Sequence, residues 1–398
     1  MLASSIGYGA GLGVLSMTSS LFVKPMRDEL GWSTKVVAFL PLTMLLVAVC
    51  TPIVGALVDR FGSRRIALIG MMAFGFSIGA LAFIPPSQFA LYTVAVILGI
   101  VGPMTSTTPF ARCVATWFDR SAGTAFGLTM NGVSFLALFV VPLISAVIYA
   151  YGWRMGYLTL SLVILLFGFP VLYFLLHERP SPRPANLANA AADKYSGMRQ
   201  VFADGRFWAV LVAIGFAGIP LGGFLGHLQP MLAAGGMPIA AATSLGVVFA
   251  ISVTLGRVGG GVLLDRYWDG GVALTLLLLS AVGAVLLSSF GVTTPFWLIA
   301  FAVLLVGMGQ GIEADFIAYF ALKMFGMRKY STVVAIYSMT AGLMMASGGF
   351  AFSVLFDAIG DYAIACLIGA GSFLISGVIL FVTRMADRHS IRSAAQAI

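Results

Sequence analysis

One arginine lies inside a long apolar segment of the chain. Arg257 is the only basic residue of segment 240–263 and comes eight residues before Asp265, or about 12 Å along a helix. A charge in the middle of a bilayer costs about 3 kcal/mol or more, so such residues are usually kept for function. A guanidinium binds a carboxylate through two parallel hydrogen bonds. If the segment spans a membrane, we expect Arg257 to bind a carboxylate substrate; the alternative is an internal ion pair without a ligand.

Two acids, Glu313 and Asp315, lie in a second apolar segment, 296–321. Glu313 comes ten residues before Lys323, about 15 Å along a helix, so its depth is comparable to that of Arg257. Residues two apart point to nearly opposite sides of a helix, so we expect the two acids to have different tasks. One can take up a proton from a cavity while the other braces a neighbouring helix, and either acid fits either task. Structural pairing without coupling is the alternative for both.

Four further polar residues are candidates for contact with a substrate. His227 lies between Pro220 and Pro230, which bend a helix, so it can bind substrate or a backbone carbonyl that the bend frees. The other three are hydrogen-bonding side chains that can line a cavity: Asn131, Tyr337 and Tyr8.

The composition places these residues in a membrane protein. Of the 398 residues, 60% are hydrophobic and 9% are charged, and the mean hydropathy is +1.03. A soluble domain carries about 25% charged residues, so this chain could not cover a water-facing surface. The three cysteines, Cys50, Cys113 and Cys366, lie far apart in apolar stretches, which indicates neither a disulfide framework nor a metal site.

Twelve segments are long and apolar enough to span a bilayer, which takes about 20 residues of helix. They are 5–25, 36–57, 65–85, 90–112, 122–149, 155–176, 208–233, 240–263, 271–291, 296–321, 331–356 and 362–383. In lipid the backbone polar groups must be satisfied inside each segment, so we expect the spans to be helices. The first segment begins almost at Met1 and is long enough to remain as a span, so we expect no cleaved signal.

The basic residues favour one orientation in the membrane. If both termini are cytoplasmic, the cytoplasmic segments hold all of the 22 lysines and arginines except five: Lys24, Arg27, Lys35, Arg154 and Arg257. This bias predicts cytoplasmic termini. It also accounts for the net charge of +8, so we expect no nucleic-acid partner.

The chain consists of one six-helix unit used twice. A hydrophilic stretch rich in Pro, Ala and Asn predicts three parts, namely an N-terminal bundle (1–176), a cytoplasmic linker (177–206) and a C-terminal bundle with a short tail (207–398). A charged motif recurs after the second and eighth spans: Gly55, Leu57, Asp59 and Arg60 match Gly261, Leu263, Asp265 and Arg266 at a constant offset of 206. The predicted fold class is an all-α membrane protein with twelve transmembrane helices in two pseudo-symmetric six-helix bundles.

The first copy of the motif, 55-GALVDRFGSRR-65, resembles the loop motif G-x-L-x-D-R-x-G-x-R-R of the major facilitator superfamily. The resemblance extends over the twelve spans, the six-plus-six repeat and the central linker. It implies the fold of that superfamily and the activity of a secondary active transporter.

Five local motifs resemble the branch that holds monocarboxylate transporters and oxalate/formate-type antiporters. They are 117-WFDRSAGTAFG-127, 227-HLQPML-232, 256-GRVGGGVLLDR-266, 307-GMGQGIEAD-315 and 325-FGMR-328. In the related carboxylate transporters the arginine of the third motif binds the substrate, so this resemblance implies the same role for Arg257.

The resemblance also assigns the charged motif to a gate. The residues it implies are Asp59, Arg60, Arg64, Arg112, Asp265 and Arg266. A carboxylate such as Asp59, placed where helix ends meet, can cap a helix N-terminus and pair with an arginine such as Arg112. The alternative for Arg60 and Arg64 is that they only anchor the topology.

The chain departs from the branch at three places. Segment 337–347, where dicarboxylate-binding members carry a basic residue, is uncharged, and a site with one cation suits a substrate with one carboxylate. Animal monocarboxylate transporters have an acid one turn before the arginine and a lysine in the first span. Here the first position is Val253 and the middle of the first span, 15–20, reads LSMTSS, so we do not expect their scheme of proton coupling.

We expect a secondary active transporter that moves a small organic monocarboxylate through the lipid bilayer by alternating access, with proton symport or anion exchange. The alternatives are efflux of a larger amphipathic compound, and a membrane sensor, which would need a soluble domain to transmit its signal. The sequence offers no paired base and nucleophile, metal cluster or nucleotide-binding loop, so we expect no catalytic residue, no enzyme activity and no cofactor. We expect a monomer in a bacterial inner membrane.

Overall fold

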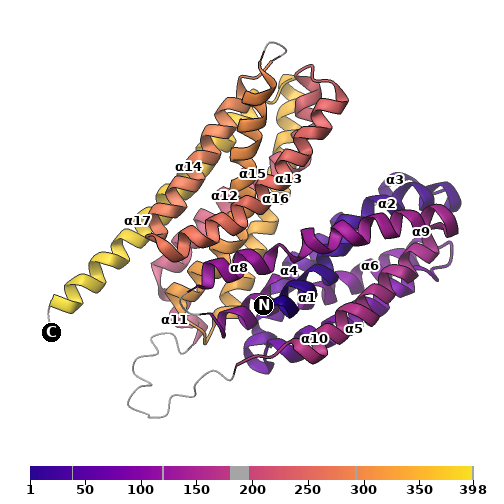
Figure 1. The fold of residues 1–398 in the computed structure, drawn as a ribbon, viewed down its shortest axis with the longest axis horizontal. Coiled ribbons are helices and arrows are strands. Elements are labelled where there is room, and N and C mark those ends of the chain that lie inside the picture. Colours follow the sequence, from indigo (N-terminus) through magenta and orange to yellow (C-terminus); the bar gives the residue numbers. More distant parts are fainter. Residues whose placement is uncertain (38, 119–120, 180–196, 292–293, 397–398) are drawn as a thin grey trace. The chain divides into compact units, whose positions relative to one another are not determined.

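The structure, a computed structural model, describes residues 1–37, 39–118, 121–179, 197–291 and 294–396 (Figure 1). Every regular element in these ranges is a helix, which confirms the predicted all-α fold class. The chain forms two compact units, which are described separately below. Of the predicted linker, residues 180–196 lie outside the described residues, and the predicted three-part division stays a prediction.

Unit 1 comprises Met1–Asp119, Leu128–Lys194 and Met324–Met339. Its helices are α1 (Leu2–Tyr8), the π-helix η1 (Gly9–Gly13), α2 (Val14–Leu30), α3 (Thr34–Val37), α4 (Leu40–Phe61), α5 (Ser63–Leu81), α6 (Gln88–Val101), the 3₁₀-helix η2 (Gly102–Thr105), α7 (Thr107–Ala115), α9 (Gly132–Leu162), the π-helix η3 (Val163–Gly168) and α10 (Phe169–Leu175). The first turns of α16 (Tyr330–Ile359) also belong to unit 1, although they come from the second half of the sequence.

Buried aromatic side chains tie α2 to α9 in unit 1. The Phe22 ring stacks on the Tyr157 ring with centroids 3.8 Å apart, and Trp153 meets Tyr157 edge to face. The Trp153 indole nitrogen donates a hydrogen bond of 2.6 Å to Glu29. A buried indole therefore keeps a partner for its N–H while its rings fill the core.

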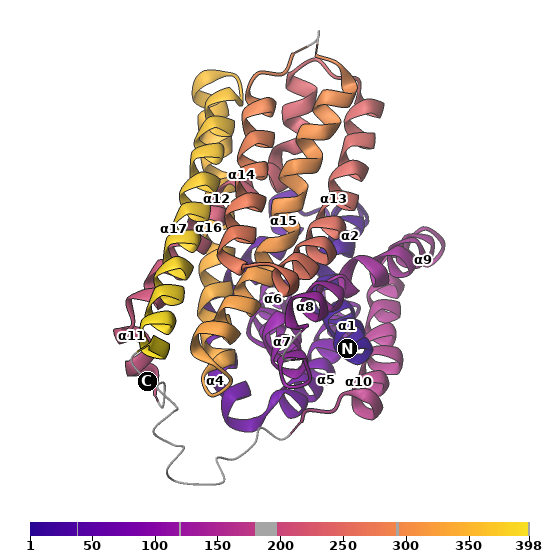
Figure 2. The ribbon, with the colours of Figure 1, turned by 60° about the vertical axis from the view of Figure 1, so that its left-hand side comes forward.

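Unit 2 comprises Arg120–Gly127, Tyr195–Lys323 and Thr340–Ile398. Its helices are the first turns of α8 (Ala122–Met130), then α11 (Met198–Ala203), α12 (Gly205–Ala234), α13 (Ile239–Arg266), α14 (Asp269–Ser288), most of α15 (Phe296–Phe325), the rest of α16, and α17 (Ala363–Gln396). Helices α14 and α17 lie side by side along much of their length (Figures 1 and 2).

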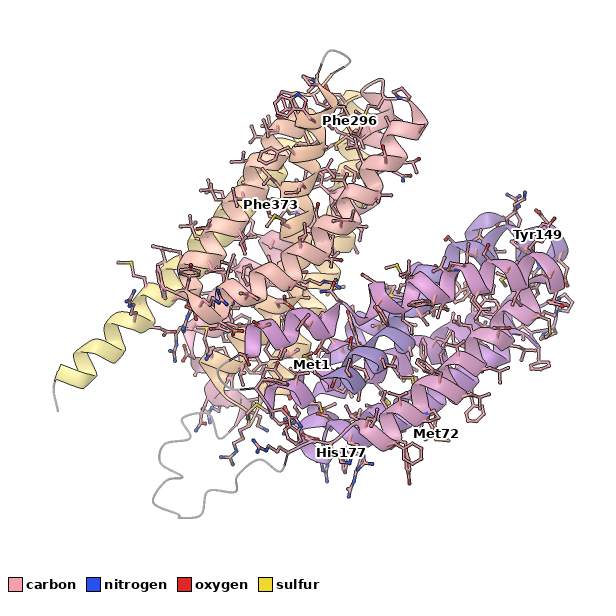
Figure 3. All side chains as sticks on the ribbon, in the orientation of Figure 1. Met1, Met72, Tyr149, His177, Phe296 and Phe373 are labelled. Carbon is pink, nitrogen blue, oxygen red and sulfur yellow. The ribbon has the colours of Figure 1, made fainter. Side chains whose placement is uncertain are left out.

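In the described residues, 11 helical segments are long and apolar enough to cross a membrane. One of them, Ala122–Leu175, has 54 residues, which as a straight helix would measure about 80 Å, more than twice the thickness of a bilayer core. Gly152 breaks this segment with a non-helical backbone and a φ of 85°. Tyr149, just before the break, stands at one end of unit 1 (Figure 3). The segment thus holds the fifth and sixth predicted spans, and all twelve are accounted for.

Glycines allow α13 and α15 to approach each other closely in unit 2. A β-carbon at Gly256 would collide with the Met308 backbone, and one at Gly311 would stand 2.9 Å from the Arg257 nitrogen. Small residues spaced by four are a common means of close helix contact in membranes. The contact sets Arg257 beside the part of α15 that carries the two acids.

Salt bridges join the ends of three helices in unit 2. Arg384 of α17 donates to both oxygens of Asp269, the first residue of α14, at 2.7–3.1 Å, and to Asp387 at 2.6 Å. Arg206, in the first turn of α12, donates to Asp387 and to Asp204, which precedes that helix. Asp269 and Asp387 are each 7% exposed, so the network pins α12, α14 and α17 together at nearly buried acids.

Replacing Arg384 with alanine is expected to lower the free energy of unfolding by about 3 kcal/mol, because the nearly buried Asp269 carboxylate loses its partner. Thermal unfolding in detergent micelles measures the effect. The matched control is Arg388→Ala, whose exposed guanidinium stands 5.8 Å over the Trp268 ring and contributes about 0.5 kcal/mol. Equal melting temperatures for the two variants would contradict this account of the network.

Candidate functional site

Arg257 lies on α13, nine residues before that helix ends at Arg266. Its guanidinium interacts electrostatically with both Glu313 and Asp315 on α15. The close packing of the two helices therefore brings together one cation and the two acids that the sequence placed at similar depth.

Both acids are removed from solvent: Glu313 is 6% exposed and Asp315 is 0% exposed. Within the described residues, neither carboxyl oxygen of Asp315 has a hydrogen-bond partner, and Oε1 of Glu313 has none. The amide oxygen of Gln310, one turn before Glu313, is likewise buried without a partner. A buried carboxylate without hydrogen bonds is costly in its charged form, so each acid needs the charge of Arg257 or a proton.

Asp59, near the end of α4, caps the N-terminus of α16. Its Oδ1 accepts a hydrogen bond of 3.1 Å from the Ser331 amide, and its Oδ2 accepts from the amide and the hydroxyl of Thr332 at 2.9 and 2.6 Å. Gly55, one turn earlier on α4, packs so closely on the Ser331 backbone and the Ala335 methyl that no side chain fits there. The carboxylate satisfies two helix amides and opposes the positive end of the helix dipole.

Asp265, near the end of α13, makes the same three bonds to the N-terminus of α8. Its Oδ1 accepts from the Gly123 amide at 2.8 Å, and its Oδ2 accepts from the amide and the hydroxyl of Thr124, each at 2.7 Å. Gly261, one turn earlier, meets the Gly123 backbone too closely for either residue to carry a side chain. The two copies of the charged motif therefore cap the N-termini of two different helices through the same set of hydrogen bonds.

An arginine and a glutamate reinforce the Asp59 cap. Arg112 of α7 forms an ion pair with Asp59, and its Nε donates to Glu178 at 3.1 Å. Glu178 also accepts a bond of 2.7 Å from the Ser63 amide at the start of α5. Arg112 is 11% exposed and Asp59 is 6% exposed, so little water competes with this chain of charges. It links α4, α5, α7 and the segment that follows α10.

The other predicted gate arginines lie closer to the surface. Arg60 is exposed, with its guanidinium carbon 5.2 Å from the centre of the Phe61 ring, and Arg266 is exposed at the end of α13. Arg64 is half-buried and donates a bond of 2.7 Å to the Tyr173 carbonyl. These positions suit the interpretation that the three arginines anchor helix ends at the membrane surface.

His227 lies on α12 in unit 2 with a partner at each ring nitrogen. Its Nε2 is 2.9 Å from the Gly349 carbonyl oxygen on α16, and its Nδ1 is 3.3 Å from the Tyr362 hydroxyl. Because a carbonyl only accepts, this geometry puts the proton on Nε2 and lets the tyrosine donate to Nδ1. His227 thus bonds a backbone carbonyl of α16 and not one that the bend of α12 frees, and its contact with substrate stays a prediction.

The remaining three candidates belong to unit 1. Tyr337 is fully buried on α16, and Asn131 is half-buried at the N-cap position of α9. Tyr8 is half-buried at the end of α1 and packs against the hydrophobic core of unit 1. Contact of these three residues with a substrate stays a prediction. The other two candidates, Arg257 and His227, belong to unit 2.

Sequence reasoning missed Glu178 and the donors of the two caps. Glu178 stands in a mostly basic stretch, 177-HERPSPR-183, that was assigned to a linker. The donors are small or hydroxyl-bearing residues at equivalent places in the two halves, since Gly123 and Thr124 precede Ser331 and Thr332 by 208 residues. Aligning the two halves beyond the charged motif would have found them.

In the described residues, apolar helices long enough to cross a membrane, a repeated carboxylate cap and a half-buried arginine beside two acids characterise an integral membrane protein. The family model described as Major Facilitator Superfamily matches residues 5–349. The chain belongs to that superfamily, as its motifs predicted.

Named relatives are distant and match over part of their length. The uncharacterized MFS-type transporter YcxA of Bacillus subtilis is 24% identical over 234 residues, which cover 56% of this chain and 55% of that protein. Monocarboxylate transporter 1 of Bos taurus is 28% identical over 147 residues, 37% of this chain and 29% of that one. The Fujikurins efflux protein of Gibberella fujikuroi is 26% identical over 168 residues, 41% and 34% respectively. The chain thus spans about half or less of these three relatives.

A solved structure shares the fold over nearly the whole chain. The fucose:proton symporter FucP of E. coli superimposes with a TM-score of 0.71 at 16% identity, covering 96% of this chain and 97% of that chain. At this identity the likeness concerns the fold alone, and it agrees with the predicted major facilitator fold.

Removing either capping carboxylate is expected to free only its own helix end. Asp59→Ala should speed hydrogen exchange of the Ser331 and Thr332 amides about tenfold, because a lost N-cap costs about 1–2 kcal/mol. Asp265→Ala should do the same at Gly123 and Thr124. Exchange measured by mass spectrometry on peptides from both regions checks this, and each variant is the control for the other. Unchanged exchange at the matching helix end would contradict the assignment of the caps.

Proposed function

We propose that the protein moves a small organic monocarboxylate across the membrane by alternating access, and that Arg257 binds the carboxylate. The proposal rests on one observation, the half-buried cation of α13 beside the two buried acids of α15. Its planar guanidinium suits a carboxylate, which it binds through two parallel hydrogen bonds. The similarity to bovine monocarboxylate transporter 1 supports this substrate class.

The charges of the cluster favour a coupled transport cycle. With both acids ionised, one positive and two negative charges leave Arg257, Glu313 and Asp315 with a net charge of −1, which repels an anionic substrate. Protonating one acid makes the cluster neutral, and protonating both leaves the guanidinium to the substrate. We therefore infer that transport is coupled to proton symport. Exchange of one carboxylate for another is the alternative mode of coupling.

The caps of Asp59 and Asp265 act as the gate in this proposal. Each joins a helix from one half of the sequence to the N-terminus of a helix from the other half. Transport by rocking of two six-helix repeats requires such contacts to break and re-form. The distribution of basic residues supports a cytoplasmic position for both caps and both termini. In this proposal the membrane is a bacterial inner membrane.

Efflux of a larger amphipathic compound is a second candidate, favoured by the similarity to the Fujikurins efflux protein. In that case Arg257 only neutralises the acids of α15 and does not touch the transported molecule. The two candidates differ in what the loss of Arg257 does to carboxylate transport.

Arg257→Ala is expected to lower uptake of a labelled monocarboxylate into proteoliposomes about 100-fold, because truncating one partner of a buried charge pair costs about 2–5 kcal/mol. Arg257→Lys should give an intermediate rate, since lysine keeps the charge but not the planar fork. The control is Arg388→Ala, which changes an exposed arginine of α17. Uptake is measured across a panel of acids, with and without a pH gradient.

Normal carboxylate uptake by Arg257→Ala would contradict the proposed role of Arg257. Failure of the wild type to move any carboxylate would contradict the substrate class, and transport of an amphipathic dye by the same liposomes would then support efflux. A rate that rises with an inward proton gradient indicates symport, whereas acceleration by unlabelled acid inside the vesicles indicates exchange.

A further inference from the structure

One face of α13 in unit 2 is covered by the first turns of α8. Three residues of α13 spaced by four, namely Arg257, Gly261 and Asp265, make this face. Gly123 of α8 lies on Gly261, and a β-carbon there would stand 3.1 Å from Oδ1 of Asp265. Gly127, one turn further on α8, lies on the Arg257 carbonyl. The Asp265 cap and the two glycines therefore hold α8 flat against α13.

Asp315 lies beneath this contact. A β-carbon at Gly127 would stand 3.3 Å from Oδ2 of Asp315, so the carboxyl group is packed under α8. Gly311, one turn earlier on α15, lies on the backbone of Arg257 and fixes the depth of Asp315 against α13. Asp315 is 0% exposed, and neither of its oxygens has a hydrogen-bond partner in the described part of the chain.

Few charged residues lie near Asp315 in the described part of the chain. Helix α13 presents Arg257, which interacts with it electrostatically, and Asp265, which is bound by the amides of α8. On α15 itself, Glu313 is two residues away and also interacts with Arg257. The sequence of α8, Ala122–Met130, contains no titratable side chain. Within the described residues, Arg257 is the cation that can balance a change of charge at Asp315.

We propose that Asp315 carries the coupling proton and that α8 is its cover, so that opening the Asp265 cap admits water to this acid. The inference rests on the proposed function and assigns one of its two candidate acids. While α8 is seated, the proton on the Asp315 carboxyl cannot exchange. When α8 separates from α13, a water molecule reaches the carboxyl, and the proton passes between Asp315 and that water without any other reactant.

This arrangement couples the gate to the proton, because the contact of α8 with α13 is both part of the gate and the cover of Asp315. Separation of α8 must break the three bonds to Asp265 and part Gly127 from Arg257 in the same movement. The backbone of Arg257, whose guanidinium a substrate carboxylate would bind, is thus uncovered together with the acid. Glu313 lies two residues away on α15, so it points to nearly the opposite side of that helix, and its role here is to hold Arg257 in place.

The transport test uses proteoliposomes with an inward proton gradient and a labelled monocarboxylate. Wild type and Glu313→Gln should both take up acid faster with the gradient than without it. Asp315→Asn should lose this acceleration while it still exchanges labelled for unlabelled acid at equal pH, and Asp315→Glu should recover it. Acceleration in Asp315→Asn, or its absence in a wild type that exchanges acid, would overturn the proposal. Absence of all carboxylate movement in the wild type would instead contradict the proposed function.

A second test needs no substrate. It therefore distinguishes a failure of the proposed role of α8 from a failure of the proposed transport function. Dicyclohexylcarbodiimide, an apolar reagent for protonated carboxyl groups, is applied to the purified full chain, and the modified acids are mapped by mass spectrometry. Loss of the α8 cap in Asp265→Ala should speed modification of Asp315 about tenfold over the wild type, as expected for about 1–2 kcal/mol. Asp59→Ala, which opens the other cap, should leave that rate unchanged. Equal rates in Asp265→Ala and the wild type would overturn the role of α8 as a cover.

Discussion

A carboxylate at a helix N-terminus bonds amides that the helix cannot satisfy by itself, and the rest of this structure depends on two such contacts. Water is scarce at these places, so an amide without a partner is costly and the position of the acid decides which helix end it meets. Asp59 caps the N-terminus of α16, and Asp265 caps the N-terminus of α8. Gly55 and Gly261 then permit the backbones to touch. The seating of α8 on α13 in turn places Gly127 over the buried charges of the site.

The spans were predictable because each one satisfies its own backbone, which needs no knowledge of its neighbours. The similar depth of Arg257, Glu313 and Asp315 was predictable for the same reason, from the rise per residue along single helices. The cover of Asp315 by α8 was not predictable, because it depends on Gly127, which lies far away in the sequence. No local sequence pattern indicates that Gly127 and Asp315 are close. The repeat of the charged motif indicated that Asp59 and Asp265 have a common role but did not name their donors.

The two caps share their bonds but not their surroundings. Asp59 is also paired with Arg112, which is itself held by Glu178, and charge-assisted bonds of this kind are about twice as strong as neutral ones. Near Asp265, the Tyr319 hydroxyl donates to the carbonyl of the neighbouring Leu264 at 3.1 Å. The repeat is therefore symmetric in the geometry of its caps, and the cap at Asp265 is the one that lies over the buried acid.

The sequence separations of the two caps have a consequence for membrane insertion. Ser331 follows Asp59 by 272 residues, whereas Asp265 follows Gly123 by 142 residues. Chains are synthesised from the N-terminus, so Asp59 enters the bilayer long before its helix donors exist, while Asp265 arrives after its donors are in place. Arg112, only 53 residues from Asp59, gives the early acid a partner during that interval. Arg112 thus pairs with the acid whose helix donors are synthesised last.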